Sequence, residues 1–409
     1  MSRELRASTV AQLTAVDLFC GAGGLSFGLQ QAGFRILGAL DSWEPAARTY
    51  EQNFSHPIVQ RNVRTLSTSE FISLIGAEHT NIDLVAGGPP CQGFSVQRIG
   101  IDHDERNDLI FEFARFVSEL KPRMFLMENV PGLLGKRGIE FAHRFERVLS
   151  ASGYAVVHAR VNGAEYGLPQ IRKRIFYYGW LRALVPHFRF PAPLLAEEQF
   201  RTAWSVIKDL PAPTFHGNKA APDPLHRQTR LSELNAERLR LIPPGGGFED
   251  LPVHMRVKCH KIGAEKIGHR YVYGRVDPDR PAPTITARFD SFTRGRFAHP
   301  YEHRNLTLRE GARFQNFPDD FKFLGSQEGI AALIGNAVPP LVANVIGSAI
   351  HSHLCMEHRD SLEGRAFEQQ ELFDAHADDS TQLCPANREK YGADRSIPLS
   401  DSCPNLSDT

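Results

Sequence analysis

The stretch Asp17-Leu-Phe-Cys-Gly-Ala-Gly-Gly-Leu-Ser-Phe-Gly28 decides the fold, because this glycine-rich turn follows a short apolar run and opens a helix. Glycines let a backbone approach a ligand closely, and open α/β sheets bind ligands at the carboxyl ends of their strands. Asp41 ends the next apolar run, about 20 residues after the turn, and a carboxylate there suits the two hydroxyls of a ribose. Together these features predict a site for a nucleoside cofactor.

Short apolar runs alternate with amphipathic stretches from Thr14 to Trp180. The runs are TAVDLFC, FRILGAL, IDLVAGG, MFLMENV, YAVVHARV and RIFYYGW. Helical spacing of apolar residues occupies the intervals 43–54, 106–120 and 139–152. This rhythm is typical of the α/β class, and we expect a doubly wound, mainly parallel sheet with crossover helices.

Composition excludes several classes of protein. Of the 409 residues, 42% are hydrophobic and 23% charged, which is a normal globular balance. The six cysteines form no CxxC pair, the N-terminus lacks the apolar region of a secretory signal, and no apolar run approaches the ~20 residues that cross a bilayer. We therefore expect a protein of the cytoplasm with reduced thiols and no membrane contact.

Changes in composition predict the domain organisation. Prolines cluster after Trp180, so we expect a first catalytic segment over 1–184 and a second, smaller and irregular domain with its hinge over 185–303. Residues 304–355 regain helical periodicity and would return to the first domain. Residues 356–409 hold 12 acidic against 5 basic residues, which indicates a disordered tail.

Local charge indicates where a polyanion would bind. Lys plus Arg equals Asp plus Glu at 47 each, so the whole chain carries no net charge. Residues 251–310, however, hold 12 Lys or Arg against 6 acids, with five histidines. A solvated basic face explains such a segment about as well as a nucleic-acid surface when the segment is taken alone.

Cys91 is the candidate nucleophile. It stands in Pro89-Pro90-Cys91-Gln92-Gly93, which follows the apolar run IDLVAGG at the same predicted sheet edge as the glycine turn. A lone cysteine is usually a small core residue, but loop-forming residues rather than an apolar stripe surround this one. Its thiol, with an ordinary pKa of ~8.5, would need a site that favours the thiolate or a substrate that becomes basic on attack.

A carboxyl group and two guanidinium groups can join this thiol. Glu128 ends the apolar run MFLM, and an acid at the end of a buried strand needs a cleft or a partner. Gln170, Arg172 and Arg174 alternate along an extended segment and would point to one face. A thiol, a carboxyl and guanidinium groups suit nucleophilic addition to a pyrimidine ring.

Six motifs in order now resemble those of the cytosine-C5 DNA methyltransferases of bacterial restriction-modification systems: DLFCGAGGLSFGL, GGPPCQGFS, MENV, YGLPQIRKRIF, RPAPTIT and IGNAVPP. The resemblance covers about residues 14–350. It implies an S-adenosylmethionine-dependent methyltransferase fold, Rossmann-like, and places the variable target-recognition region between Trp180 and Arg280. It also implies transfer of a methyl group to carbon 5 of a cytosine, with no metal.

The resemblance assigns roles residue by residue. Cys91 would attack carbon 6 of the base, Glu128 would hold and protonate it, and Arg172 with Arg174 would orient the ring and Glu128. The residues expected to line the S-adenosylmethionine site are Phe19, Gly21, Gly23, Gly24, Asp41, Asn62, Val63, Pro90, Leu109, Asn336 and Val338. Thr284 and Thr286 would brace the recognition region.

Two positions depart from the family pattern. The family usually has an Asp that contacts the adenine amine, where this chain has Asn62, whose amide oxygen can still accept that hydrogen bond. The aromatic residue that often stacks on the adenine stands one place late, as Trp43 after Ser42.

The target cytosine must leave the duplex to be reached, at a cost of a few kcal/mol. We expect Gln97 or Arg98, in the polar stretch 95–106, to contact DNA there. Arg288, Arg294 and Arg296 are the candidates for reading base edges in duplex DNA. We further expect a monomer, with a companion restriction endonuclease as a possible partner.

Other functions explain the sequence less completely. A nicotinamide-dependent oxidoreductase would use the glycine turn and Asp41, but Ser26 stands where the dinucleotide pattern needs a third glycine, and PPCQ, ENV and QIRKR have no role in it. A transfer-RNA cytosine methyltransferase of the same family remains an open alternative. Such enzymes have a short recognition region, whereas this chain has about a hundred residues between Trp180 and Arg280. A non-catalytic DNA-binding regulator leaves Cys91, Glu128 and Arg174 together unexplained.

Overall fold

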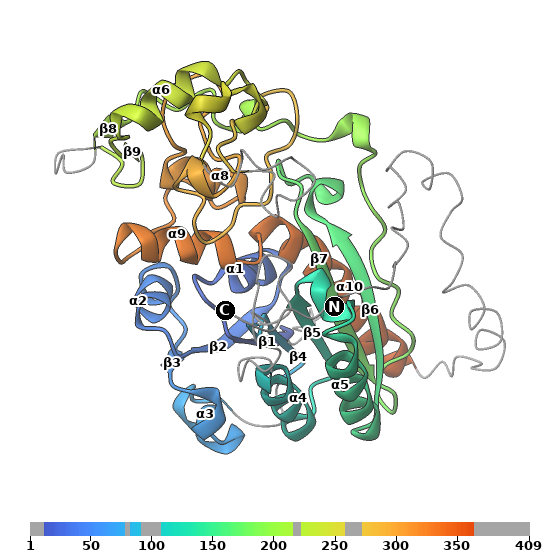
Figure 1. Ribbon diagram of the computed structural model, residues 1–409. Coiled ribbons are helices and arrows are strands. Elements are labelled where there is room, and N and C mark those ends of the chain that lie inside the picture. Colours follow the sequence, from blue (N-terminus) through green and yellow to red (C-terminus); the bar gives the residue numbers. More distant parts are fainter. Residues whose placement is uncertain (1–11, 78–81, 91–107, 216–221, 258–271, 364–409) are drawn as a thin grey trace, which may run out of the picture. The chain divides into compact units, whose positions relative to one another are not determined.

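A seven-stranded sheet with the order β3-β2-β1-β4-β5-β7-β6 organises the chain (Figure 1). The computed structural model describes residues 12–77, 82–90, 108–215, 222–257 and 272–363. The strands are β1 (Thr14–Leu18), β2 (Arg35–Asp41), β3 (Ile58–Gln60), β4 (Leu84–Gly87), β5 (Met124–Asn129), β6 (Tyr154–Asn162) and β7 (Lys173–Leu181). The first five in spatial order pair in parallel, whereas β7 is antiparallel to both β5 and β6. The predicted doubly wound, mainly parallel sheet is confirmed.

Helices cover both faces of the sheet because its strands are apolar on both sides. One face packs on α3 (Thr68–Leu74), α4 (Leu109–Leu120) and α5 (Ile139–Ala151). The other face packs on α1 (Gly24–Gln31) and α10 (Pro340–Glu363). The helix α2 (Glu44–Asn53) connects β2 to β3, and its Tyr50 packs with Ala39 of β2.

All six strands expected from the apolar runs are present, and so are the three expected crossover helices. The sequence reading missed β3 and α3, because a three-residue strand and a seven-residue helix are too short to show a period. It also ended the last helix too early: α10 runs to Glu363, beyond the predicted start of the tail at 356. The chain divides into two units after Glu357, and residues 364–409 lie outside the described part.

In its described residues, the predicted recognition region contains little regular structure. Its elements are β8 (Thr214–Phe215), β9 (Arg227–Gln228) and α6 (Glu233–Leu241). A small apolar cluster holds Leu239, Ile242, Leu251, Phe292 and Ala298. The chain then returns through α8 (Leu308–Phe314) and α9 (Gln327–Asn336), which share an apolar cluster with Ala22 and Ala46 of the sheet region. The predicted boundaries at 185 and 303 stay a prediction.

Buried arginines compensate for the small apolar cluster. Arg275 is 2% exposed and donates to the carbonyls of Leu239, Ile242, His299 and Glu302. One guanidinium therefore satisfies four backbone acceptors in two segments, 239–242 and 299–302. Burial lowers the pKa of Arg275 to about 10, which still leaves it charged at neutral pH.

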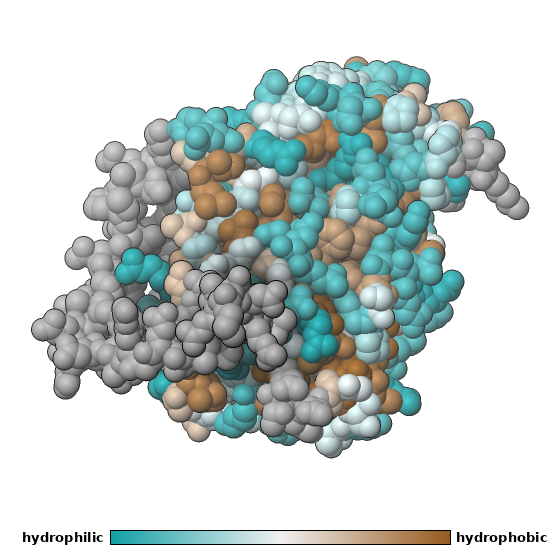
Figure 2. All heavy atoms as spheres, turned by 180° about the vertical axis from the view of Figure 1, so that it is seen from behind, coloured by the Kyte–Doolittle hydropathy of each residue, from teal (hydrophilic) through white to brown (hydrophobic). Residues whose placement is uncertain are grey.

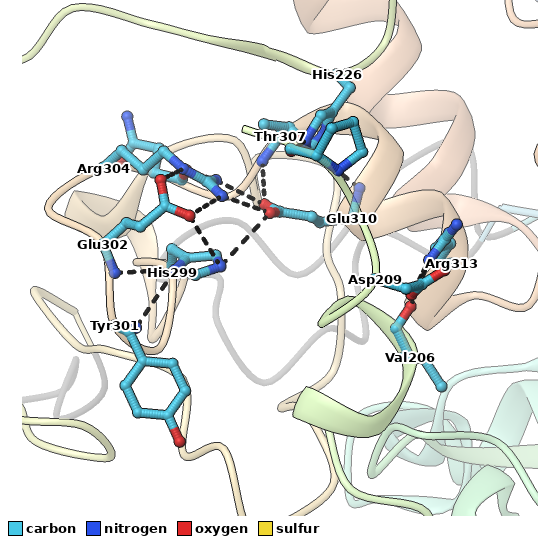
Figure 3. A network of polar contacts seen from close by, with 12 residues as sticks. Val206, Asp209, His226, His299, Tyr301, Glu302, Arg304, Thr307, Glu310 and Arg313 are labelled. Atoms are coloured by element: carbon cyan, nitrogen blue, oxygen red, sulfur yellow. Dashed lines mark hydrogen bonds and ion pairs between the residues drawn. The ribbon is translucent and has the colours of Figure 1, made fainter. Parts of the chain in front are cut away.

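A second polar network joins the region to α8 (Figure 3). Arg304 donates to both carboxylate oxygens of Glu310, at 2.7 and 2.9 Å, and also to Glu302 at 3.0 Å. Glu310 accepts in addition from the backbone N–H of Thr307, forming the capping box of α8. The ring Nδ1 of His299 accepts from the N–H of Glu302 at 2.9 Å, so the neutral ring carries its proton on Nε2, towards the carboxylates.

One apolar stretch, Gln327–Met356, is long enough to cross a membrane by length and composition. It comprises two helices, α9 and α10, and 67% of its most apolar window is buried inside the protein. The face in Figure 2 is mostly hydrophilic, with its hydrophobic residues in separate small patches. The stretch therefore behaves as a pair of core helices.

Gly28 allows α1 to lie against α10. A Cβ atom at Gly28 would lie 2.3 Å from the carbonyl oxygen of Pro340 and 2.5 Å from the Cβ of Ala343. Although alanine favours helices, we predict that Gly28→Ala lowers the free energy of unfolding by about 1–3 kcal/mol, because the backbones must separate. Urea unfolding monitored by circular dichroism measures the change.

The matched control is Gly329→Ala in α9, where the nearest atom to a new Cβ is the Ser326 hydroxyl at 3.2 Å. We expect a change within about 0.5 kcal/mol there. Equal effects of the two substitutions would contradict the proposed close packing of α1 on α10.

Candidate active site

The site lies at the carboxyl edge of the sheet, where β1 and β4 are neighbours although the chain visits β2 and β3 between them. The N–H of Gly88 donates to the carbonyl of Leu18 at 3.3 Å, and a Cβ at Gly87 would lie 2.4 Å from that same oxygen. The glycine turn after β1 and the segment Gly88-Pro89-Pro90 after β4 are therefore adjacent. This is the topological switch point at which such sheets bind ligands.

The glycine turn adopts a backbone that few residues tolerate. Gly21 and Gly23 have φ values of 54° and 91°, and Phe19 has 59°, which is an outlier for a bulky residue. A Cβ at Gly21 would meet no atom within 4 Å, so this part of the turn faces open space. At Gly24, by contrast, a Cβ would lie 2.3 Å from the carbonyl oxygen of Val338. The turn thus leaves room for a ligand on one side and packs on the IGNAVPP segment on the other.

Asp41 fixes this turn. Its Oδ2 accepts from the N–H of Gly21 at 2.9 Å, and its Oδ1 accepts from the N–H of Trp43 at 2.8 Å. Burial raises the pKa of Asp41, and these backbone hydrogen bonds oppose the rise. Because an ionised carboxylate can accept about four hydrogen bonds, Asp41 retains the capacity that the predicted ribose contact needs.

The remaining predicted cofactor residues differ in their exposure and in their contacts. Val338 is 7% exposed and Val63 is 4% exposed, so both belong largely to the core. Leu109 begins α4 and Asn336 ends α9 with its side chain exposed. Asn62 uses its side-chain oxygen to accept from the N–H of Arg64 at 3.1 Å. That local contact holds Asn62 in place and occupies one of its two acceptor positions.

Glu128 and Arg174 form the charged centre of the site. Glu128 is paired with Phe176 in the β5–β7 ladder, and strand alternation places Arg174 on the same face as Glu128. Arg174 Nε lies 2.7 Å from Glu128 Oε1, with the two side chains 17% and 11% exposed. The pair is an ion pair without hydrogen-bond alignment, because Glu128 Oε1 has no hydrogen-bond partner in the described structure. The carboxyl therefore still has acceptor positions for a substrate.

The segment that leads to Cys91 is held beside this carboxyl. The side-chain amide of Asn129 donates to the carbonyl of Pro89 at 3.2 Å. A Cβ at Gly88 would lie 3.7 Å from Glu128 Oε2. Cys91, Gln97 and Arg98 lie outside the described residues, so their predicted roles stay predictions.

Arg172 makes different contacts from those of Arg174, although the charges of both Arg174 and Glu128 act on it. It is 2% exposed and donates to three backbone carbonyls: those of Ile285 at 3.1 Å, Gly335 at 3.1 Å and Ala337 at 2.9 Å. Burial, and next the positive charge of Arg174, lower its pKa. These contacts form a structural strut that joins β7 to the RPAPTIT and IGNAVPP segments. The role predicted for Arg172, to orient the ring and Glu128 together with Arg174, stays a prediction.

Two further side chains complete the strut: Gln170, which the sequence places on one face with Arg172 and Arg174, and Gln315, which no sequence motif indicated. Gln170 accepts from the N–H of Ile285 at 2.8 Å and donates to Gln315 at 2.9 Å. Gln315 in turn donates to the carbonyl of Ile334 at 2.6 Å. Thr284, predicted to brace the recognition region, donates its hydroxyl to the carbonyl of Ile171 at 2.6 Å. Alternation from Gln170 to Arg174 was the signal for this cluster, but its partners lie more than 110 residues away.

The three arginines predicted to read DNA have different surroundings. Arg294 is exposed. Arg288 is also exposed but faces two acids, Glu328 at 3.3 Å and Asp290 at 3.8 Å. Arg296 is half-buried and donates to the carbonyl of Gly245 at 2.5 Å. Arg296 thus holds the PPGGGF loop, and Arg294 is the freest of the three to reach a partner.

Comparison with known proteins agrees with these motifs. A family model described as C-5 cytosine-specific DNA methylase matches residues 13–352. Type II methylase M.HgiDII of Herpetosiphon aurantiacus is 33% identical over 83% of this chain and 95% of its own length. Type II methyltransferase M1.HphI of Haemophilus parahaemolyticus is 34% identical over 83% of this chain and 86% of its own. Among solved structures, a candidate DNA modification methyltransferase from a prophage of E. coli aligns with a TM-score of 0.63 and 27% identity, over 84% of this chain and 99% of that one.

Substitutions of Arg172 and Arg174 can test whether Arg172 mainly stabilises the fold and Arg174 mainly serves the reaction. We predict that Arg172→Met lowers the free energy of unfolding by about 3–5 kcal/mol, because three buried carbonyls lose their donors. Arg174→Met should cost no more than about 2 kcal/mol but lower kcat by about 100-fold, because Glu128 loses its partner. Urea unfolding and single-turnover methyl transfer measure the two effects, and a kcat loss without destabilisation in Arg172→Met would contradict the strut.

The raised pKa of Asp17, which lies beneath the glycine turn, predicts that the stability of the protein depends on pH. Burial raises its pKa to about 7, and hydrogen bonds from Ser26 oppose the rise. Because the folded pKa exceeds the unfolded value of ~3.9, the stability this carboxyl contributes is complete below pH ~4 and is lost as the pH rises through 7. We predict that wild type loses about 2–3 kcal/mol relative to Asp17→Asn between pH 5 and pH 8. Urea unfolding at both pH values measures this, and parallel profiles would contradict it.

Proposed function

The chain belongs to the C-5 cytosine-specific DNA methylases, and we propose that it methylates carbon 5 of a cytosine flipped out of a short duplex DNA sequence, with Cys91 as the nucleophile. As a member of this family it is a DNA cytosine methyltransferase. The observation that best supports the finer proposal is the Glu128–Arg174 ion pair beside the segment that ends in Pro90. That arrangement leaves a carboxyl, partly shielded from water, beside Gly88 in the described segment that precedes Cys91 in the sequence.

The glycine turn fits S-adenosylmethionine. Gly21 leaves space that a side chain would fill, and Asp41 is anchored with lone pairs to spare for the ribose hydroxyls. Phe19, Val338 and Leu109 would supply apolar contacts to the nucleoside. When bound, S-adenosylmethionine supplies an electrophilic methyl group on a sulfonium.

The residues of the chain would prepare the cytosine for this methyl group. Glu128 would take the thiol proton of Cys91, Cys91 would add as a thiolate to carbon 6, and Glu128 would pass that proton to ring nitrogen 3 as electron density moves into the ring. Arg174 would hold Glu128 and stabilise the charge that develops on oxygen 2. Addition at carbon 6 makes carbon 5 nucleophilic. After methylation a base, for which water is the candidate, would take the carbon 5 proton, Cys91 would leave as a thiolate, and ring nitrogen 3 would return its proton to Glu128.

The substrate must be extruded for this chemistry, since the target atoms are inaccessible within a duplex. Gln97 and Arg98 are candidates to fill the gap left by the base, and Arg294 is the first candidate to read a base edge. We expect the enzyme to act as a monomer in the cytoplasm. Relatives named as Type II methyltransferases suggest a companion endonuclease that acts on the same site.

Methyl transfer to nucleic acid tests the proposal directly. Purified enzyme is incubated with labelled S-adenosylmethionine and either duplex DNA of mixed sequence or transfer RNA, and the DNA product is sequenced after bisulfite treatment. We expect label in DNA at cytosines of one short motif, and none with Cys91→Ala. Label in transfer RNA alone would replace the DNA proposal with the transfer-RNA alternative.

Glu128→Gln separates chemistry from cofactor binding. We predict that kcat falls by about 10²–10⁴-fold, because an amide cannot deliver the proton to ring nitrogen 3. The Kd for S-adenosylmethionine should stay within about twofold of the wild-type value, since the glycine turn and Asp41 are untouched. Equilibrium dialysis and single-turnover kinetics measure the two quantities, and a wild-type kcat would exclude Glu128 as the acid.

A further inference from the structure

Four side chains form a continuous line of hydrogen bonds beneath the glycine turn. The hydroxyl of Ser26 donates to Asp17 Oδ2 at 2.7 Å, and the hydroxyl of Tyr50 donates to Ser26 Oγ at 2.7 Å. The ring Nε2 of His56 lies 2.6 Å from the Tyr50 oxygen. Because Tyr50 gives its one proton to Ser26, His56 must donate to Tyr50 from Nε2. Every donor in the line then points towards Asp17, which is the arrangement that an ionised carboxylate prefers.

The far end of this line reaches a cavity of about 550 Å³ on the opposite edge of the sheet. His56 lines that cavity with Gln12, Ser55 and Arg35, the residue that begins β2. Burial lowers the pKa of His56 to about 4, so the ring is neutral near pH 7 and can pass a proton between its two nitrogens. Asp17 is fully buried, and the line connects it to the cavity without opening the core.

No cation among the described residues pairs with Asp17, and its Oδ1 has no hydrogen-bond partner there. The ionisable groups that face it are Asp41 from β2, the thiol of Cys20, and Tyr50 from α2. Each of these groups is neutral or negative, so the protein itself supplies no charge to favour the ionised form. A positive charge would have to come from a ligand at the glycine turn.

We propose that Asp17 senses the charge of the nucleoside at the glycine turn: it ionises when the cationic sulfonium is bound and regains its proton when the neutral thioether product takes that place. This inference rests on the proposed function, because the turn must hold S-adenosylmethionine. An opposite charge nearby favours ionisation of a buried carboxyl, and a neutral sulfur leaves desolvation unopposed. Asp17 would thereby favour the substrate over the product, which differ by one methyl group and one charge.

The proton has a balanced route. When Asp17 is protonated at Oδ2 the line runs in reverse, with Ser26 donating to Tyr50 and Tyr50 to His56 Nε2. As Asp17 ionises, its proton passes to Ser26, that of Ser26 passes to Tyr50, and that of Tyr50 passes to His56 Nε2. His56 then releases the proton on Nδ1 to the cavity. One proton leaves the protein for each sulfonium bound, and one returns when the thioether replaces it.

Titration calorimetry measures the released proton without any turnover. Wild-type protein is titrated with S-adenosylmethionine or S-adenosylhomocysteine at pH 6.5 in buffers of different ionisation enthalpy. We expect release of about 0.5 proton with the sulfonium and close to none with the thioether. The ratio of their affinities should rise about threefold to tenfold in favour of the sulfonium from pH 6 to pH 8.

Three variants identify the group. Asp17→Asn should abolish both the proton release and the pH dependence of the affinity ratio. Glu44→Gln, which removes an exposed acid from the first turn of α2, should behave as wild type. Ser26→Ala removes one donor to the carboxylate and should move the midpoint of the pH dependence up by about one unit, which keeps the test open if Asp17→Asn fails to fold.

Equal proton release with both nucleosides, or its persistence in Asp17→Asn, would overturn the inference and assign the titration to another group such as Asp41. An unchanged midpoint in Ser26→Ala would also overturn it. Binding of neither nucleoside would overturn the proposed function as well, whereas binding of both without a difference overturns this inference alone.

Discussion

The guanidinium of Arg172 joins three parts of the chain that are distant in sequence. It is buried where β7 begins and donates to carbonyls of the RPAPTIT segment, of the end of α9 and of the turn before α10. Buried backbone acceptors need donors, and none of these carbonyls lies in a sheet. This contact therefore joins residues 335–337 and the RPAPTIT segment to the residues that begin β7. The neighbouring Gln170 and Gln315 add hydrogen bonds to the same segments.

Two arginines on one strand face thus have opposite uses because their partners differ. Arg172 meets carbonyl groups, which hold it without neutralising it, and Arg174 meets the carboxylate of Glu128. An ion pair that leaves carboxylate acceptors open can still take a ligand. Arg172 uses its two terminal nitrogens for protein carbonyls, and its Nε has no hydrogen-bond partner among the described residues. The QIRKR motif therefore combines fold and chemistry in five residues, and alternation along the strand explains why both arginines belong to it.

Much of the fold follows from the sequence, because buried parallel strands are apolar and the connecting helices are amphipathic. The positions of Asp41, Glu128 and the segment before Cys91 at one sheet edge follow in turn from the expected parallel order. The partners of Arg172 could not be predicted, because a hydrogen bond to a carbonyl leaves no mark on the identity of the residue that accepts it. The contacts of residues 185–303 could not be predicted either. Arg275 and Arg304 have the sequence context of candidate DNA-binding residues, but both are buried: Arg275 donates to backbone carbonyls and Arg304 pairs with Glu310.

The distribution of charge explains how one chain can serve a polyanion and a cation at once. Several arginines in residues 251–310 contact other groups of the protein. Exposed side chains such as Arg294 are therefore the candidates to contact phosphates or bases. Negative charge is concentrated instead at the glycine turn, where Asp41 binds backbone amides and Asp17 lies beneath them with a raised pKa. Two acids without a cation are costly in a core, and a ligand that brings its own positive charge lowers that cost. On the proposed function, the chain would therefore separate a cationic cofactor from a polyanionic substrate by charge, with two acids at the glycine turn and exposed basic side chains in residues 251–310.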